Sequence, residues 1–232
     1  MDEMFKRESE MTGSAERWMR AQGLSVKAEF NTPWGACDLV GARLNCGNVA
    51  RRVSLGQTRA IGSISRVALL LRVPDVETRR STSLNSLARL WGDSVSTETL
   101  CDEVERLVAD RFLLRTRTGR LQKLNGWLPL QERIVAVELK LTRIDEAVQQ
   151  AHRNLGFADE SFVAFPQEVA SRVTSNLKRW SAFNAGVGLL SVTPDACEVL
   201  VPPKRAVECV NSAIQVYCVE KFWRTRLKDS ST

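Results

Sequence analysis

The chain has 232 residues, 44% of them hydrophobic, and a net charge of +6, the balance of a folded protein that can bury its own core. Its one histidine, His152, excludes histidine-rich metal sites and the HEXXH protease motif. Its cysteines form no CxxC pair, which excludes zinc ribbons and thioredoxin-type motifs. The basic surplus permits a polyanionic partner but does not require one.

The sequence also bears on where the protein works. The first ten residues are charged and lack the apolar segment of a secretory signal. The longest apolar run, Val67–Leu71, is too short to cross a bilayer. Scattered cysteines without a pairing pattern are typical of free thiols in a reducing compartment, so we expect a cytoplasmic protein without membrane contact. The six are Cys37, Cys46, Cys101, Cys197, Cys209 and Cys218.

The first fifty residues predict a helix followed by two strands. Ser14 can cap the helix and Gly23 can end it. A strand over Leu24–Phe30 and a turn at residues 31–33 come next. The second strand, over Ala36–Gly41, is interrupted by one acid, Asp38.

The middle of the chain has a different pattern. Three helices are expected, over residues 57–72, Ser83–Trp91 and Thr97–Ala109. A basic hairpin over residues 112–124 follows, with a tight turn at Thr118–Gly119. Three helices and a two-stranded wing describe a winged helix-turn-helix. We therefore expect an inserted domain over residues 51–125, within a discontinuous core formed by residues 1–50 and 126–232.

Residues 129–193 carry the clearest α/β signal. The β-branched run at Ile134–Val137 is typical of a strand buried on both faces. A helix over residues 144–155, a strand over Ser161–Phe165, a helix over residues 167–184 and a strand over Gly188–Val192 follow. This alternation predicts parallel crossovers. A last helix is expected from residue 207 onward.

Charged residues inside two of these strands are the candidate site. Side chains alternate along a strand, so Glu138 and Lys140 share one face while Leu139 points into the core. Buried charges are unfavourable unless they are paired or bind a metal. If the strand of Asp38 is adjacent, two carboxylates and the carbonyl of Leu139 offer the oxygen ligands that Mg²⁺ prefers. Lys140 would then orient the attacking water and stabilise phosphate charge.

These residues resemble the PD-(D/E)XK, or restriction-endonuclease-like, superfamily. The resemblance rests on the segments 36–41, 135–140, 147–151 and 158–166 and covers somewhat under half the chain. It implies a mixed sheet flanked by helices, a Mg²⁺ or Mn²⁺ cofactor held by Asp38 and Glu138, and Lys140 assisting water. Family members often add a first-helix Glu and a Gln on the helix after the motif strand, for which Glu16 and Gln150 (or Gln149) are the candidates.

Two features depart from the family pattern, and each candidate has an ordinary alternative. Cys37 replaces a frequent proline, and 99 residues separate Asp38 from Glu138, enough to contain the inserted module. The alternatives are a strand-edge pair for Glu138 and Lys140, a turn-capping role for Asp38, and solvated helix positions for Glu16 and Gln150. Glu29 is another candidate carboxylate, and His152 is expected to make an ordinary polar contact.

The positive charge is concentrated in the insertion. Residues 43–128 carry 15 basic and 8 acidic side chains, whereas residues 129–193 carry 7 of each. Residues 97–110, the third inserted helix together with Asp110, have a net charge of −4, which argues against insertion between DNA phosphates. The wing together with Arg111 before it carries +5 and is the better candidate for phosphate contacts. The expected nucleic-acid contacts are Arg51, Arg52, Arg115, Arg117, Arg120 and Lys123, with Arg59 and Arg66 as further basic positions.

The function expected from the resemblance is metal-dependent hydrolysis of DNA phosphodiester bonds, as an endonuclease in restriction, defence or repair. The first alternative is a non-catalytic regulator that binds nucleic acid. The second is a nuclease-fold scaffold subunit recruited through the winged helix and the C-terminal helix. Duplex or single-stranded DNA, a homodimer and a partner protein all stay open at this point, as do DNA versus RNA and one metal versus two.

Overall fold

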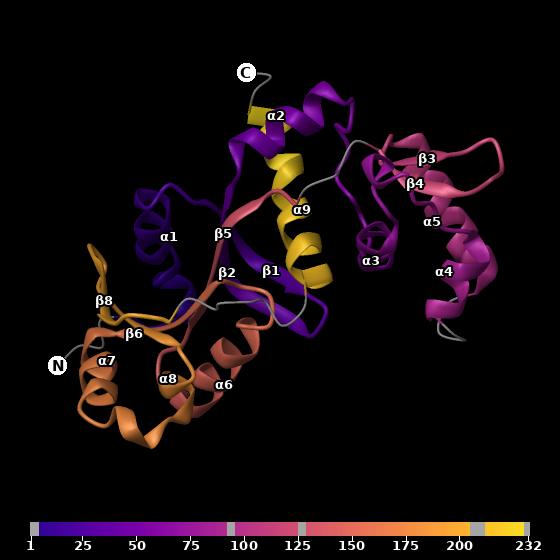
Figure 1. Cartoon of the computed structure of the whole chain (residues 1–232). Coiled ribbons are helices and arrows are strands. Elements are labelled where there is room, and N and C mark those ends of the chain that lie inside the picture. The colour runs from indigo at the N-terminus through magenta and orange to yellow at the C-terminus, as the bar shows by residue number, and fades with distance from the viewer. Residues whose placement is uncertain (1–4, 92–95, 125–128, 205–211, 230–232) are drawn as a thin grey trace. The chain divides into compact units, whose positions relative to one another are not determined.

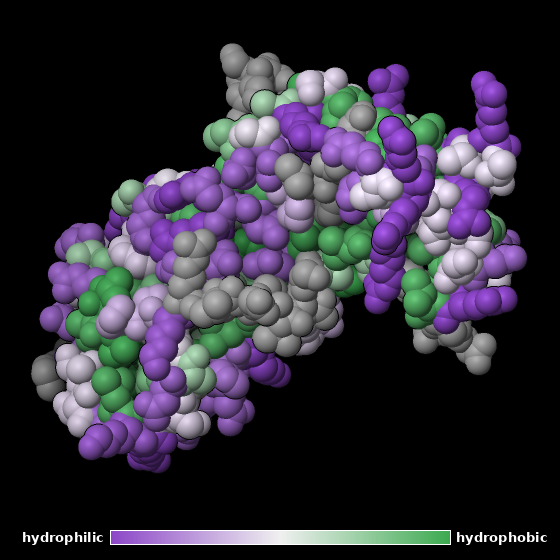
Figure 2. All heavy atoms as spheres, viewed as in Figure 1, coloured by the Kyte–Doolittle hydropathy of each residue, from purple (hydrophilic) through white to green (hydrophobic). Residues whose placement is uncertain are grey.

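The computed structural model describes residues 5–91, 96–124, 129–204 and 212–229. The chain folds as two compact units, one formed by Met1–Arg43 with Gln131–Gln215, the other by Leu44–Leu130 with Val216–Thr232. In the space-filling view, hydrophilic side chains cover much of the visible face, with smaller apolar areas among them (Figure 2). Within the described ranges, no helix has both the length and the apolar character to cross a membrane.

The first unit is built on a mixed six-stranded sheet in the order β1-β2-β5-β6-β7-β8 (Figure 1). Strands β1 and β2 form an antiparallel hairpin, β5, β6 and β7 are parallel, and β8 returns antiparallel to β7. Helices α6 and α7 connect the parallel strands, as the alternating sequence pattern predicts. The strands are β1 Ser25–Thr32, β2 Gly35–Leu44, β5 Gln131–Leu139, β6 Glu160–Pro166, β7 Gly188–Val192 and β8 Cys197–Val201.

Helices cover both faces of this sheet. Alternation along β5 and β6 sends Val137, Leu139 and Phe162 to one face, where they pack with Met19 of helix α1. On the other face, Val163 and its neighbours pack against α6 and α7. The prediction that Leu139 points into the core is confirmed. The helices of this unit are the 3₁₀ helix η1 Glu8–Glu10, α1 Thr12–Ala21, α6 Ile144–Asn154, α7 Gln167–Thr174, the 3₁₀ helix η4 Leu177–Arg179 and α8 Ser181–Asn184.

The second unit combines helices with a small antiparallel hairpin. The β3–β4 hairpin turns through Gly119, whose φ of 74° suits glycine. An isolated bridge from Thr82 to Leu121 adds a third short segment beside it. The elements are α2 Cys46–Ser54, α3 Ile64–Arg72, the 3₁₀ helix η2 Val76–Thr78, α4 Leu84–Trp91, α5 Thr97–Ala109, β3 Leu113–Arg115, β4 Leu121–Lys123 and α9 Ser212–Asp229, whose first residues belong to the other unit.

The unit boundaries differ from the expected 1–50, 51–125 and 126–232. The C-terminal residues from Val216 onward belong with the inserted segment and not with the sheet. The physical reason lies in α9, where Glu220 forms a buried ion pair with Arg52 at 2.5 Å. In the same helix, the indole of Trp223 donates to the carbonyl of Thr58 at 2.7 Å. A helix remote in sequence therefore completes the second unit.

Several element boundaries also differ from the expected ones. The single helix expected over residues 167–184 is three short helices, since the run Thr174–Asn176 has low helix propensity. The helix expected over 57–72 begins only after Ser63, whose side chain accepts from the backbone N–H of Arg66. Ser14 lies inside α1 instead of capping it. Helix α2 and strand β8 were not expected.

Candidate functional site

Three charged side chains come together where β2 and β5 are neighbours. Asp38 lies on β2, Glu138 lies on β5 and Lys140 directly follows β5. The Nζ atom of Lys140 lies 3.6 Å from Oδ2 of Asp38. The same carboxylate oxygen accepts a hydrogen bond of 2.7 Å from the backbone N–H of Leu139. The structure thus brings together the Asp, Glu and Lys that the sequence singles out.

Glu138 is the buried member of this group, with 2% of its surface exposed. Its Oε1 atom accepts a hydrogen bond of 2.6 Å from the side-chain amide of Asn154 on α6. Burial raises the pKa of Glu138 to about 7, and the negative charge of Asp38 adds to the rise, while Asn154, Cys37 and Lys140 oppose it. Glu138 can therefore change charge near neutral pH, and a nearby cation would favour its carboxylate form.

Cys37, the residue before Asp38 on β2, is buried. Its sulfur accepts from the amide of Asn154 at 3.4 Å, and the thiol lies 3.7 Å from the carbonyl of Val137. Burial raises the pKa of this thiol well above its ordinary value, and the charges of Glu138 and Asp38 add to the effect. Cys37 is therefore a neutral group that packs between the strands and completes the surroundings of Asn154.

Lys140 has a second acidic neighbour, which sequence reasoning missed. Its ammonium lies 3.6 Å from Glu8 as well as from Asp38. The other oxygen of Glu8 lies 3.6 Å from Arg143, which also pairs with Glu146 at 2.9 Å. Glu8 belongs to a three-residue 3₁₀ helix, and so short an element has no periodic pattern that could have drawn attention to it.

The structure places the two additional candidates differently. Glu16 on α1 forms an ion pair with Arg20 one turn away, and among the described residues before α1 it is Glu8 that lies beside Lys140. Gln150 lies on α6 one turn before Asn154, and positions four apart share a helix face. Within the described residues its Oε1 atom is buried without a hydrogen-bond partner. A buried acceptor of this kind needs a donor or a cation.

The strand beside Asp38 is locally irregular. The β1–β2 ladder pairs Ala28 with Leu39 and Phe30 with Cys37, which leaves Glu29 opposite Asp38 and outside the ladder. Glu29 has φ = 47°, in the left-handed region that side chains with a Cβ seldom adopt. Strained backbone of this kind is often found at functional sites. Opposite Asp38, Glu29 thus combines a carboxylate with a left-handed backbone conformation.

The donor groups can be tested for a divalent cation by their chemistry. No group of three His, Cys, Asp or Glu side chains suited to a metal is found in the part of the chain that the structure describes. The available set is two carboxylates, from Asp38 and Glu138, together with the backbone carbonyl of Leu139. Such hard oxygen ligands suit Mg²⁺, which usually keeps several waters. The partnerless Oε1 of Gln150 adds a buried acceptor on the helix that contacts Glu138.

Arg52 was expected to contact nucleic acid, and the structure corrects this. Its side chain is 2% exposed and pairs with Glu220. The guanidinium carbon also lies 5.0 Å from the ring centre of Phe112 and 4.8 Å from that of Trp223. Arg52 is thus part of the core of the second unit and cannot reach a phosphate.

The other expected contacts differ in exposure, and most of them already have a partner. Arg115 pairs with Glu105, and Arg120 donates to Ser81. Arg51 lies 3.6 Å from Glu77, and Lys123, largely buried, lies 3.5 Å from Asp75. Two further basic positions are also paired, Arg59 with Asp110 and Arg66 with Glu103. Within the described residues, Arg117 is exposed at the end of the β3–β4 hairpin without an ion-pair partner.

Comparisons with known proteins add little to this geometry. No protein-family model matches the chain, and no curated protein matches it. A similar solved structure is the SPO1766 protein of unknown function from Silicibacter pomeroyi, with 19% sequence identity and a TM-score of 0.31. The similarity covers 54% of this chain and 82% of that one.

Proposed function

We propose that the protein is a nuclease that hydrolyses phosphodiester bonds in DNA with the help of Mg²⁺ or Mn²⁺. The observation that carries the proposal is the meeting of Asp38, Glu138 and Lys140, with the lysine ammonium 3.6 Å from the Asp38 carboxylate. Two carboxylates with one lysine suit both a divalent cation and a phosphate. The resemblance of these residues to the PD-(D/E)XK motif supports the same activity.

Each residue has a defined role in this proposal. Asp38, Glu138 and the carbonyl of Leu139 would hold the cation, which when bound supplies a more acidic water and neutralises phosphate charge. The N–H of Leu139 fixes the Asp38 carboxylate through a bond of 2.7 Å. Asn154 fixes that of Glu138 at 2.6 Å. Lys140 places a positive charge where a phosphate oxygen or the attacking water would lie.

Cleavage assays test this proposal directly. Plasmid and single-stranded DNA are incubated with the purified protein in Mg²⁺, Mn²⁺ or EDTA. We expect metal-dependent cleavage that falls about 100-fold or more in Asp38→Asn and Glu138→Gln, because each change removes a charged ligand. Glu132→Gln, exposed on the same strand, and Asp195→Asn, in the turn after β7, are matched controls that should keep full activity. Equal cleavage by the site variants and wild type would refute the assignment.

A second candidate function rests on the inserted unit. We propose that α3, α4, α5 and the β3–β4 hairpin form a winged helix, supported by the bridge from Thr82 to Leu121, which adds the third short strand typical of that motif. A protein that used this unit alone would be a non-catalytic regulator or a scaffold subunit. Metal-independent DNA binding without cleavage by wild type would favour the regulator. Absence of both DNA binding and cleavage would favour the scaffold.

A further inference from the structure

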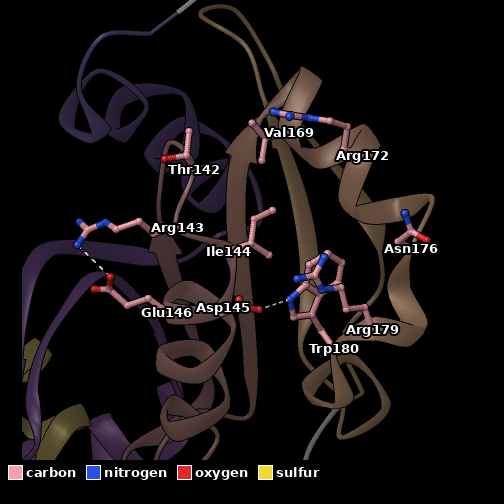
Figure 3. A pocket seen from close by; sticks show the side chains of 10 residues that line it. All are labelled: Thr142, Arg143, Ile144, Asp145, Glu146, Val169, Arg172, Asn176, Arg179 and Trp180. Carbon is pink, nitrogen blue, oxygen red and sulfur yellow. Dashed lines mark hydrogen bonds and ion pairs between the residues drawn. The ribbon is translucent and has the colours of Figure 1, made fainter.

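A groove lies on the side of the first unit that carries α6 and α7. Its central hollow has a volume of about 630 Å³ and is lined by residues of the loop after β5, of α6, of α7 and of the segment up to Trp180 (Figure 3). A hollow of about 350 Å³ shares Arg179 and Trp180 with it. Another of about 320 Å³ shares Thr142 and Arg172. The two smaller hollows therefore each adjoin the central one.

The groove begins close to the candidate site. Thr142 and Arg143 line the central hollow and follow Lys140 by two and three residues. Glu8 contacts both Lys140 and Arg143, at 3.6 Å in each case. A chain molecule that reached the site could therefore continue into this groove.

Trp180 forms a fixed aromatic wall of the central hollow. Its indole N–H donates to Asp145 at 2.6 Å, and its ring meets that of Phe183 edge-on at 6.5 Å. The guanidinium carbon of Arg179 lies 5.4 Å from the indole centre. Figure 3 shows these two side chains together at one end of the hollow, Arg172 at the other, and Ile144 between them. An aromatic ring and a guanidinium plane are both surfaces on which nucleobases stack.

The charged side chains that line the groove leave two arginines available to bind a phosphate. Within the part of the chain that is described, neither Arg172 nor Arg179 forms an ion pair, and both are exposed. Two acids of the central hollow already have partners, Asp145 with Trp180 and Glu146 with Arg143. A third acid, Glu168, lines only the outer hollow beside Thr142. Two unpaired guanidinium groups next to a stacking surface are complementary to a base and its neighbouring phosphate.

We infer that this groove binds single-stranded nucleic acid beside the candidate site, with a base stacked on Trp180 and Arg179 and a phosphate held by Arg172. The inference deepens the proposed nuclease function and rests on it for the nature of the ligand. Bases in a duplex are stacked on one another and cannot reach such a surface, so the groove selects single strands. A central hollow of about 630 Å³ is large enough for a nucleotide.

Anisotropy of a fluorescein-labelled 12-nucleotide single strand, titrated with protein in EDTA, tests the groove without cleavage. We expect Trp180→Leu to weaken binding about 10-fold, and Arg172→Ala and Arg179→Ala each about 5-fold, as loss of one stacked base or one phosphate contact implies. Trp180→Phe should keep most of the affinity because the ring remains. The matched control is Arg153→Ala, an exposed arginine of α6 outside the groove. A duplex of the same sequence should bind all of these proteins alike.

The outcomes separate this inference from the proposed function. Wild-type affinity in both arginine variants, whose side chains form no ion pair within the described residues, would overturn the groove even if Trp180→Leu misfolds. If the groove variants lost the same affinity for the duplex as for the single strand, selection of single strands by stacking would be refuted. The groove would be supported if Asp38→Asn bound the single strand normally and the groove variants bound it weakly. If wild type then cleaved no DNA in Mg²⁺ or Mn²⁺, the nuclease proposal would be refuted and the groove would stand.

Discussion

Glu138 is the site residue whose surroundings most oppose its charge. It is almost fully buried, and its nearest charged neighbours are an acid that disfavours its ionisation and a lysine that favours it. The amide of Asn154 donates to it and keeps the carboxyl in place. In the proposed function, a carboxyl group held in this way would lose its proton when a cation binds.

This placement predicts an unusual pH dependence of stability in the metal-free protein. The pKa of Glu138 rises from 4.5 to about 7 on folding, so between these values the native state holds a proton that the unfolded state has released. The contribution of Glu138 is therefore complete below pH 4.5 and is lost as the pH rises through 7, by roughly 3 kcal/mol in the free energy of unfolding. In Glu138→Gln this loss should vanish.

Urea unfolding in EDTA at pH 5 and pH 8 measures the effect. The difference between the two pH values should be smaller in Glu138→Gln than in wild type, and unchanged in Glu132→Gln, which makes the same substitution at an exposed position of β5. Identical pH dependence in wild type and Glu138→Gln would show that Glu138 ionises normally in the folded protein.

At the scale of elements, α9 is the helix on which the second unit depends. It brings Glu220 to Arg52 of α2 and to the backbone N–H of Ile61, which it accepts at 2.9 Å. Burial raises the pKa of Glu220, while the charge of Arg52 opposes the rise. The indole of Trp223 lies over the same guanidinium. A single buried ion pair therefore joins the last helix to the first helix of the insertion.

Removing one partner of this ion pair should lower the free energy of unfolding strongly, whereas replacing both partners should lower it little. We expect Arg52→Met to lower the free energy of unfolding by about 3 kcal/mol, because it leaves the Glu220 carboxylate buried without a counter-charge. The double variant Arg52→Met with Glu220→Leu should recover most of that loss. Urea unfolding checks both. The exposed Arg89→Met is the matched control, and a loss in Arg52→Met no greater than in this control would contradict the prediction.

The sequence predicts patterns better than it predicts long-range partners. Side-chain alternation along β5 was enough to place Glu138 and Lys140 on one face and Leu139 on the other. The acidic partners of Lys140 and Arg52 could not be predicted from sequence patterns. Glu8 lies 132 residues from Lys140 in sequence, and Glu220 lies 168 residues from Arg52. A basic residue looks the same in sequence whether it faces solvent or an acid folded back from a distant helix.

At the scale of the whole molecule, the inserted unit should make nucleic-acid binding depend on salt. Arg117 is exposed and unpaired within the described residues, whereas Glu103 and Glu105 of α5 are already occupied by Arg66 and Arg115. The exposed acids that remain on α5, such as Asp102, oppose a phosphate backbone. In the proposed DNA complex, the hairpin would therefore be the better phosphate contact.

Charge reversal compares the hairpin with the helix. In the proposed DNA complex, Arg117→Glu should weaken binding and reduce the slope of log affinity against log salt by about 1, because one phosphate contact is lost. Arg106→Glu makes the same change on α5 and should have little effect. A larger effect of Arg106→Glu would indicate that α5 enters the groove of DNA after all, and no effect of either change would assign the unit to a protein partner.

The separation of β2 from β5 in sequence has a consequence for synthesis of the chain. Strand β2 ends at Leu44 and β5 begins at Gln131, so 86 residues are translated between two strands that are neighbours in the sheet. At about 5–20 residues per second this takes roughly 4–17 s, during which the inner edge of β2 has no partner. The second unit waits longer still, because Glu220 follows its partner Arg52 by 168 residues. Both units therefore complete their folding late, and a nascent chain bearing an unpaired apolar strand is the form most in need of a chaperone.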